Sequence, residues 1–154
     1  MDIEEQYDKI YRYCYFKMYD DQIAQEITQE TFLRFCKQGL NLGSDKELPY
    51  LYTIAKNLCI DHFRKRTVES LEEITEEVID DPTEDMISNL TLRMTISKLP
   101  EDEQELIFLR YVNEVSITTI CKITGLSRFA VYRKLSKSLK WLKEELLKEG
   151  FSNG

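Results

Sequence analysis

The 154-residue sequence contains little that would interrupt a helix, with only five glycines and three prolines. Because these two residues are the commonest helix breakers, their scarcity favours a helical chain. Long apolar runs are also missing, so we expect no membrane insertion. The acidic start MDIEEQYDK lacks the basic and apolar parts of a signal peptide, which predicts a cytoplasmic location.

The sequence also lacks the cysteine and histidine spacings that are typical of metal sites and disulfide frameworks. The four cysteines, Cys14, Cys36, Cys59 and Cys121, are widely spaced, and His62 is the only histidine. A zinc site needs about four clustered N or S ligands, and disulfide frameworks belong to secreted proteins. We interpret the cysteines as small apolar residues of helix interiors, with redox sensing as the alternative. The sequence therefore predicts no metal site and no cofactor.

Negative charge is concentrated in one stretch of the chain. Residues 1–66 carry 10 basic and 11 acidic side chains. Residues 67–86 carry no basic and nine acidic side chains, and residues 87–154 carry 11 basic and eight acidic ones. The overall charge of −7 therefore reflects the middle stretch, and the C-terminal part is net basic. We interpret residues 67–86 as an acidic flexible linker between two small domains.

Apolar periodicity predicts an all-α protein. Helices are expected at roughly 3–19, 21–38, 48–66, 84–98, 101–112, 116–124 and 127–149. Pro49 and Pro100 are expected in first helical turns, where a missing N–H is tolerated. The predicted fold is a three-helix N-terminal bundle and a C-terminal helix-turn-helix domain.

The segment 116–146 has the pattern of a helix-turn-helix. Its short first helix ends at Gly125, which tolerates the left-handed turn conformation, and Ser127 then caps a second helix. Cys121 supplies a small side chain where two such helices must cross. The second helix of this motif enters the major groove of DNA.

This second helix has two chemically different sides. A helical projection predicts an apolar stripe of Val131, Leu135, Leu139, Leu142 and Leu146. On the other side Arg133 suits a guanine edge, while Lys137 and Lys140 suit phosphates; the alternative is an ordinary solvated basic face. The residues predicted to contact DNA are Arg128, Phe129, Tyr132, Arg133, Ser136, Lys137 and Lys140.

Three blocks of the sequence resemble, in order and spacing, the extracytoplasmic-function (ECF) sigma factors of bacterial RNA polymerase. Ile23–Phe35 and Pro49–Arg66 resemble sigma region 2, and Leu99–Lys143 resembles region 4. The resemblance implies a region 2-like domain at 1–66, a linker at 67–86 and a region 4-like domain at 87–150 that binds the −35 promoter element. It implies a protein that directs core polymerase to specific promoters and initiates transcription.

The helix expected at 21–38 places Leu33 among acidic and amide residues. A leucine ringed by polar side chains suits a protein interface better than plain solvent exposure, although a solvated face remains the alternative. In sigma factors the matching face binds the clamp helices of the largest polymerase subunit. The resemblance implies this role for Glu26, Gln29, Glu30 and Leu33.

The helix expected at 48–66 carries amides, basic groups and an aromatic ring on its outward half, which suits phosphate contacts and base stacking. The resemblance implies that this helix, with the preceding loop at 38–48, reads the −10 element. Asp61 is equally explained as a partner of a nearby arginine, whereas His62 lies on the inward stripe and is interpreted as a core residue and not as a DNA contact. The predicted −10 contacts are Tyr50, Thr53, Lys56, Asn57, Ile60 and Arg64.

The chain departs from the family pattern at two positions of the helix expected at 127–149. It has the aromatic residues Phe129 and Tyr132 where the family commonly has small or polar residues. Acidic residues common in the family are replaced by Thr118 and Thr119. The two aromatic side chains make the −35 preference hard to derive, and they are compatible with a target rich in thymine methyl groups.

The resemblance also implies three partners: core RNA polymerase, promoter DNA and an anti-sigma factor. A different interpretation is a stand-alone helix-turn-helix regulator, which leaves residues 26–66 without a purpose. An enzyme is disfavoured because the sequence has no Gly-rich phosphate loop and no evident catalytic residues, and no small-molecule substrate is expected. The linker suits a basic channel of polymerase, or serves only as a solubilising spacer.

Changing the nine acidic residues of 67–86 to Asn and Gln should tighten binding of the free chain to −35 duplex DNA. The intact acidic stretch competes electrostatically with DNA for the basic helix, and this competition weakens as salt shortens the Debye length to about 8 Å or less. Fluorescence anisotropy at two salt concentrations measures the effect. Equal affinities of the two proteins at low salt would contradict the prediction.

Overall fold

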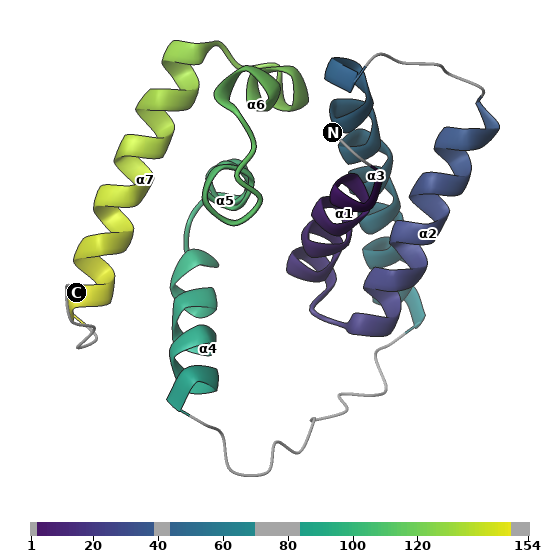
Figure 1. Ribbon diagram of the computed structural model, residues 1–154. Coiled ribbons are helices and arrows are strands. Elements are labelled where there is room, and N and C mark those ends of the chain that lie inside the picture. Colours follow the sequence, from purple (N-terminus) through teal and green to yellow (C-terminus); the bar gives the residue numbers. More distant parts are fainter. Residues whose placement is uncertain (1–2, 39–43, 70–83, 149–154) are drawn as a thin grey trace. The chain divides into compact units, whose positions relative to one another are not determined.

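The computed structural model describes residues 3–38, 44–69 and 84–148, and these residues form helices with short connections and no strands (Figure 1). None of the described helices is long and apolar enough to cross a membrane. Packing divides the molecule into two compact units. The first unit contains the N-terminal helices together with Thr118–Gly125, and the second contains the remaining C-terminal helices.

The first unit is built on three mutually packed helices, α1 (Ile3–Met18), α2 (Asp21–Lys37) and α3 (Ser44–Glu69). Asp20 caps α2, because its carboxylate accepts a hydrogen bond from the Ile23 N–H at 3.0 Å. The predicted three-helix N-terminal bundle is confirmed.

The core of this bundle combines small and aromatic side chains. Ile10, Cys14, Ala24, Leu51 and Ala55 are completely buried. Tyr13 and Tyr52 meet edge to face in the same core, with ring centroids 5.3 Å apart. On α3, Tyr52 and Cys59 are buried together with Leu51 and Ala55.

The α3 helix begins at Ser44, four residues earlier than predicted, so Pro49 lies inside the helix and not in its first turn. A tertiary contact explains the longer helix: Gln6 of α1 donates a hydrogen bond to the Glu47 carboxylate at 2.9 Å, and Leu48 is buried beside it. These contacts offset the hydrogen bond that proline cannot donate. The loop predicted at 38–48 is correspondingly shorter, and its residues 39–43 lie outside the described part.

The second unit contains α4 (Glu84–Ile96), α5 (Glu101–Ile107), a π-helical turn η1 (Phe108–Val112) and α7 (Arg128–Lys148). The helix predicted at 101–112 therefore changes its hydrogen-bond pattern at Phe108. Both α4 and α5 pack against α7. The ends of the predicted linker 67–86 are helical, in α3 and α4, and residues 70–83 lie outside the described residues.

The apolar side of α7 differs from the predicted stripe at two positions. Val131, Leu135 and Leu142 are buried as predicted, but Leu139 is 38% exposed and Ser138 is only 1% exposed. Ser138 lies seven residues after Val131 and four before Leu142, so it occupies the centre of the stripe. Its small polar side chain concealed this position in the sequence pattern.

Replacing Ser138 with alanine should stabilise the second unit by about 1 kcal/mol. The Ser138 hydroxyl is buried and has no hydrogen-bond partner in the described structure, so removing it relieves a desolvation cost. Trp141, the only tryptophan of the chain, lies one turn away and reports unfolding of this unit in urea by fluorescence. The exposed Ser136→Ala is the matched control, and a Ser138→Ala protein that unfolds at lower urea than wild type would refute the prediction.

Candidate nucleic-acid and protein interfaces

The turn before α7 has the geometry predicted from Gly125. This glycine has φ +77°, and its N–H donates to the Cys121 carbonyl at 2.8 Å, closing the end of α6 (Ile117–Thr124). Ser127 then accepts a hydrogen bond from the Ala130 N–H at 3.1 Å and caps α7. Both ends of the turn are therefore fixed by local hydrogen bonds, as predicted from Gly125 and Ser127.

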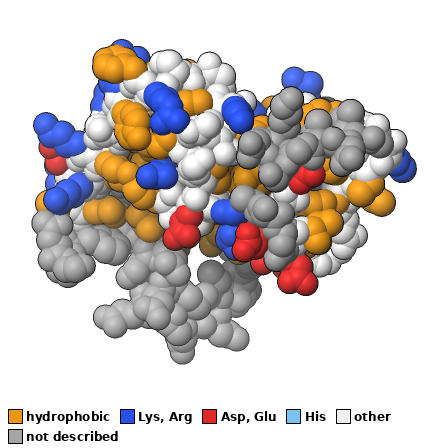
Figure 2. Space-filling model, turned by 45° about the horizontal axis from the view of Figure 1, so that its top comes forward, with side chains coloured by type: hydrophobic (Ala, Val, Ile, Leu, Met, Phe, Trp, Pro, Cys, Tyr) orange, Lys and Arg blue, Asp and Glu red, His pale blue; other side chains and the backbone are white. Residues whose placement is uncertain are grey.

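The outward face of α7 carries the side chains that the sequence predicted as DNA contacts. All seven of them are exposed: Arg128, Phe129, Tyr132, Arg133, Ser136, Lys137 and Lys140. Figure 2 shows Lys and Arg side chains interspersed with hydrophobic ones on the left of the view, with few acidic side chains among them. Cations beside exposed aromatic rings suit a surface that meets both phosphates and bases.

Two of these residues contact each other. The Arg133 guanidinium carbon lies 5.9 Å from the centroid of the Phe129 ring, one helical turn earlier. This is cation–π distance, and the interaction restrains a long side chain that would otherwise sample many rotamers. Phe129 itself is 76% exposed.

A second contact ties α7 to the start of α5. Lys134 donates to the Asp102 carboxylate at 2.5 Å, and this hydrogen bond holds the pKa of Asp102 below its usual value. The ion pair is therefore present at neutral pH and is lost only as pH falls through that lowered pKa. Lys134 was missed as a functional residue because nothing in the sequence indicated its partner 32 residues away.

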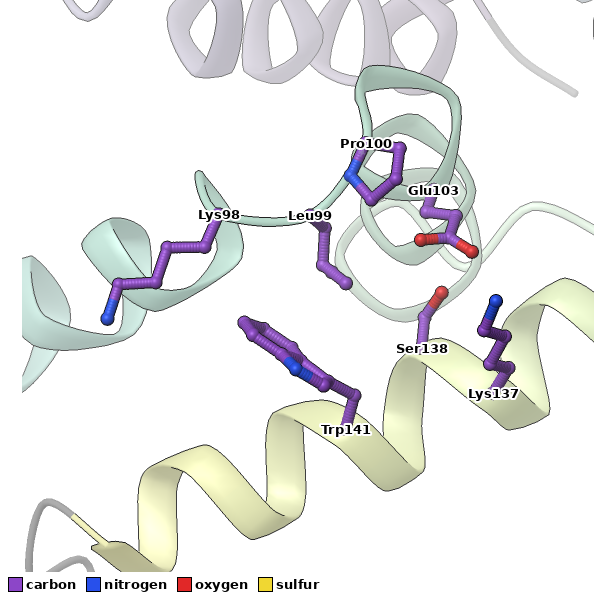
Figure 3. A pocket seen from close by; sticks show the side chains of 7 residues that line it. All are labelled: Lys98, Leu99, Pro100, Glu103, Lys137, Ser138 and Trp141. Atoms are coloured by element: carbon purple, nitrogen blue, oxygen red, sulfur yellow. The ribbon is translucent and has the colours of Figure 1, made fainter.

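Hollows on both sides of Glu103 lie along the same α5–α7 contact. One, of about 330 Å³, is lined by Glu103, Arg133, Lys134 and Lys137. The other, of about 250 Å³, adds the apolar walls of Leu99, Pro100 and Trp141. Figure 3 shows the Glu103 carboxylate, the Lys137 ammonium and the Ser138 hydroxyl directed toward one another. The carboxylates of α5 therefore partly offset the basic charge of α7.

The predicted −10 face of α3 lies mostly outward. Thr53, Lys56, Asn57, Ile60 and Arg64 are exposed. From Thr53 to Arg64 this exposed face extends over about 16 Å of helix, similar to roughly five stacked nucleotides. The one exception is Tyr50, which is half-buried.

Tyr50 is held by α2 instead of standing free. Its hydroxyl donates to the Gln38 side-chain oxygen, and its ring lies 6.0 Å from the ring of Phe35. Among the residues with other interpretations, Asp61 is exposed and His62 is half-buried, so His62 is not a fully buried core residue.

The predicted polymerase-binding face of α2 is exposed around a central leucine. Leu33 is 54% exposed, and Glu26 and Gln29 are exposed on the preceding turns. Glu30 is half-buried and accepts a hydrogen bond from the Arg34 guanidinium at 3.0 Å. The opposite side of α2 is buried through Ala24, Ile27, Thr28 and Thr31.

An aromatic row that runs along α1 and onto Tyr19, the residue after its end, was not singled out from the sequence. Tyr11, Tyr15 and Tyr19 follow one another at intervals of four residues, with ring centroids 6.3 and 5.7 Å apart. The Tyr11 hydroxyl donates to Asp21, which raises the pKa of Tyr11 to about 12. The four-residue spacing is visible in the sequence and is the signal from which this row could have been predicted.

The described residues contain no group of three or more His, Cys, Asp and Glu side chains arranged to hold a metal ion. What they do contain is a helix-turn-helix turn, an exposed basic and aromatic α7, and a helical bundle with outward polar faces. These features are typical of helical DNA-binding proteins.

Comparisons with known proteins identify the family. Residues 3–68 match the family model of sigma-70 region 2, and residues 89–142 match that of sigma-70 region 4. The chain is 31% identical to the ECF RNA polymerase sigma factor SigW of Bacillus subtilis, over 90% of this chain and 83% of SigW. It is also 31% identical to the ECF sigma factor BldN of Streptomyces coelicolor over 80% of this chain, which spans only 51% of BldN.

The fold agrees with these matches. The sigma factor RpoE of Bartonella quintana, solved in complex with the anti-sigma factor NepR, superposes with a TM-score of 0.67 at 22% identity, covering 95% of this chain and 94% of RpoE. The chain belongs to the ECF RNA polymerase sigma factors, the promoter-recognition subunits that act in transcription initiation. The resemblance seen in the three sequence blocks is confirmed.

Substituting Asp102 with asparagine should strengthen binding of the free chain to duplex DNA of any sequence. The substitution releases Lys134, and one further phosphate contact steepens the slope of log K against log salt by about 0.9. Glu144→Gln is the control, because it makes the same charge change on α7 at an exposed site. Anisotropy titrations over a salt series measure both variants, and identical slopes for the two would show that the ion pair does not restrain Lys134.

Proposed function

We propose that the chain directs core RNA polymerase to its promoters through three separate faces: α2 for the polymerase, α3 for the −10 element and α7 for the −35 element. The observation that carries this proposal is Leu33, more than half exposed at the centre of a polar face on α2. An exposed leucine on a well-packed helix loses contact with water only when a partner covers it.

The α2 face has the composition of a protein interface and not that of a DNA contact. Glu26, Gln29 and Glu30 surround Leu33, and acidic groups repel phosphates. An apolar anchor with a polar rim is typical of the centre of an interface. In this proposal Leu33 binds an apolar recess on the clamp helices of core polymerase, and the rim residues orient the contact.

The two DNA-reading faces divide the promoter between them. On α3, Lys56 and Arg64 neutralise phosphates while Asn57 is placed for a base edge. On α7, Arg133 reads a guanine edge, and Lys137 and Lys140 bind phosphates. Tyr50 contributes less than predicted from sequence, because its ring and hydroxyl are engaged with Phe35 and Gln38.

The domain assignment 1–66, 67–86 and 87–150 follows from the same proposal, with one domain for each promoter element. An anti-sigma factor that covers the Leu33 face or the −10 helix is the proposed regulator, as NepR accompanies RpoE of Bartonella quintana. The proposed place of action is the cytoplasm, where the polymerase works, and the proposed role requires no catalytic residue. A stand-alone regulator is disfavoured, because the region 2 match accounts for residues 3–68.

Leu33→Ala, alone and with Glu30→Ala, should reduce binding to core polymerase by about 30-fold or more, the loss typical of a hot-spot residue. The bundle should stay folded, because Leu33 projects away from its core. Co-elution with core polymerase measures binding, and circular dichroism measures helix content.

Two controls separate binding from folding. Leu92→Ala removes a leucine of similar exposure from the second unit and should leave polymerase binding intact. Leu51→Ala removes a completely buried leucine and should destabilise the bundle by about 2–5 kcal/mol. A Leu33→Ala protein that unfolds like Leu51→Ala would remove the argument for this interface.

A further inference from the structure

The N-terminal end of α7 exposes more of a large apolar side chain than any other described position. Phe129 is the second residue of the helix and is 76% exposed, while its neighbour Tyr132 is 53% exposed. An exposed phenylalanine ring has no polar group that can form a hydrogen bond. Removing it from water by contact with another apolar group lowers the free energy of the protein. Its position directly after the turn is the part of such a helix that meets base edges.

The surroundings of Phe129 favour DNA over protein as the occupant. Arg128, Arg133 and Lys137 are exposed on the same helix, so the ring stands among cations. Such a surface attracts phosphates. Within a major groove the only apolar group on a base edge is the 5-methyl group of thymine. A phenylalanine, which has no hydrogen-bonding atom, can therefore discriminate among bases only through that methyl group.

The Phe129 ring also fixes its neighbour Arg133. The guanidinium lies 5.9 Å from the ring centroid, so part of its conformational freedom is lost before DNA binds. One helical turn separates the two residues, about 5.4 Å along the axis, which compares with about 3.4 Å between successive base pairs. The two side-chain ends therefore reach the same or adjoining base pairs.

We propose that Phe129 and Arg133 act as one reading unit for a thymine next to a guanine in the −35 element. The Phe129 ring packs on the thymine methyl group, and the ring holds the Arg133 guanidinium for bidentate hydrogen bonds to O6 and N7 of the guanine. Phe129 is thus both a specificity residue and a positioning residue for Arg133. This inference rests on the proposed role of α7.

The test uses holoenzyme reconstituted from core polymerase and the full chain. Duplexes with a randomised −35 segment and a constant −10 segment are selected for binding, and we expect neighbouring thymine and guanine to be enriched. Replacing the selected thymine by uracil removes only the methyl group. This change should weaken wild-type binding about fourfold, the effect of uncovering one methyl-sized group.

Three variants separate the two roles of Phe129. Phe129→Ala should bind the thymine and uracil duplexes equally and should also discriminate less at the guanine. Phe129→Leu keeps an apolar side chain but loses the π face, so it should retain the thymine preference while its guanine preference falls. Leu139→Ala, an exposed apolar position of α7 outside the reading face, is the control and should behave as wild type.

The outcomes distinguish this inference from the function on which it rests. Selection of a −35 sequence with equal binding of thymine and uracil duplexes by wild type would overturn the inference and leave the role of α7 intact. Weaker holoenzyme assembly by Phe129→Ala, with the thymine-to-uracil ratio of the holoenzyme that does form equal to that of wild type, would make Phe129 a protein contact and also overturn it. A selection that enriches no sequence in the randomised segment would refute the proposed role of α7 itself.

Discussion

Burial of one apolar stripe on α7 is the constraint that determines which residues form the outward face of this helix. Once Val131, Leu135 and Leu142 are packed against α4 and α5, the rotation of the helix about its axis is fixed. Burying each such side chain contributes roughly 1.5–3 kcal/mol, whereas an exposed ion pair contributes about 0–1 kcal/mol. The apolar stripe therefore decides which side chains face outward, and the Lys134–Asp102 pair only adjusts the result.

The same logic operates in the first unit with smaller residues. Ala24, Thr28 and Thr31 are completely buried on α2, and their small size lets the neighbouring helices approach closely. The two threonine hydroxyls donate to the carbonyls of Ala24 and Ile27 at 2.7 and 2.8 Å, so they are satisfied within their own helix. With this side committed to the core, Leu33 is left on the outside.

The helices, the turn and the exposed sides were predictable because each follows from local sequence. Periodicity located the helices, and Gly125 and Ser127 adopt the backbone and capping roles that their chemistry favours. Two of the misses share one cause, which is contact between segments distant in the chain. The start of α3 depends on Gln6, and the state of Lys134 depends on Asp102. Burial of the polar Ser138 shows that position on a helix can override side-chain polarity.

The charges of α5 and α7 affect how the second unit would bind DNA. Asp102 pairs with Lys134, and Glu103 faces Lys137, so carboxylates of α5 compete with phosphates for the cations of α7. Such competition lowers affinity for DNA of every sequence, because phosphate contacts carry no sequence information. It leaves untouched the apolar ring of Phe129 and the guanidinium beside it, the two groups of the proposed reading unit. The overall affinity therefore falls while the ratio of specific to nonspecific binding is kept, and affinity is restored when several faces of one chain bind together.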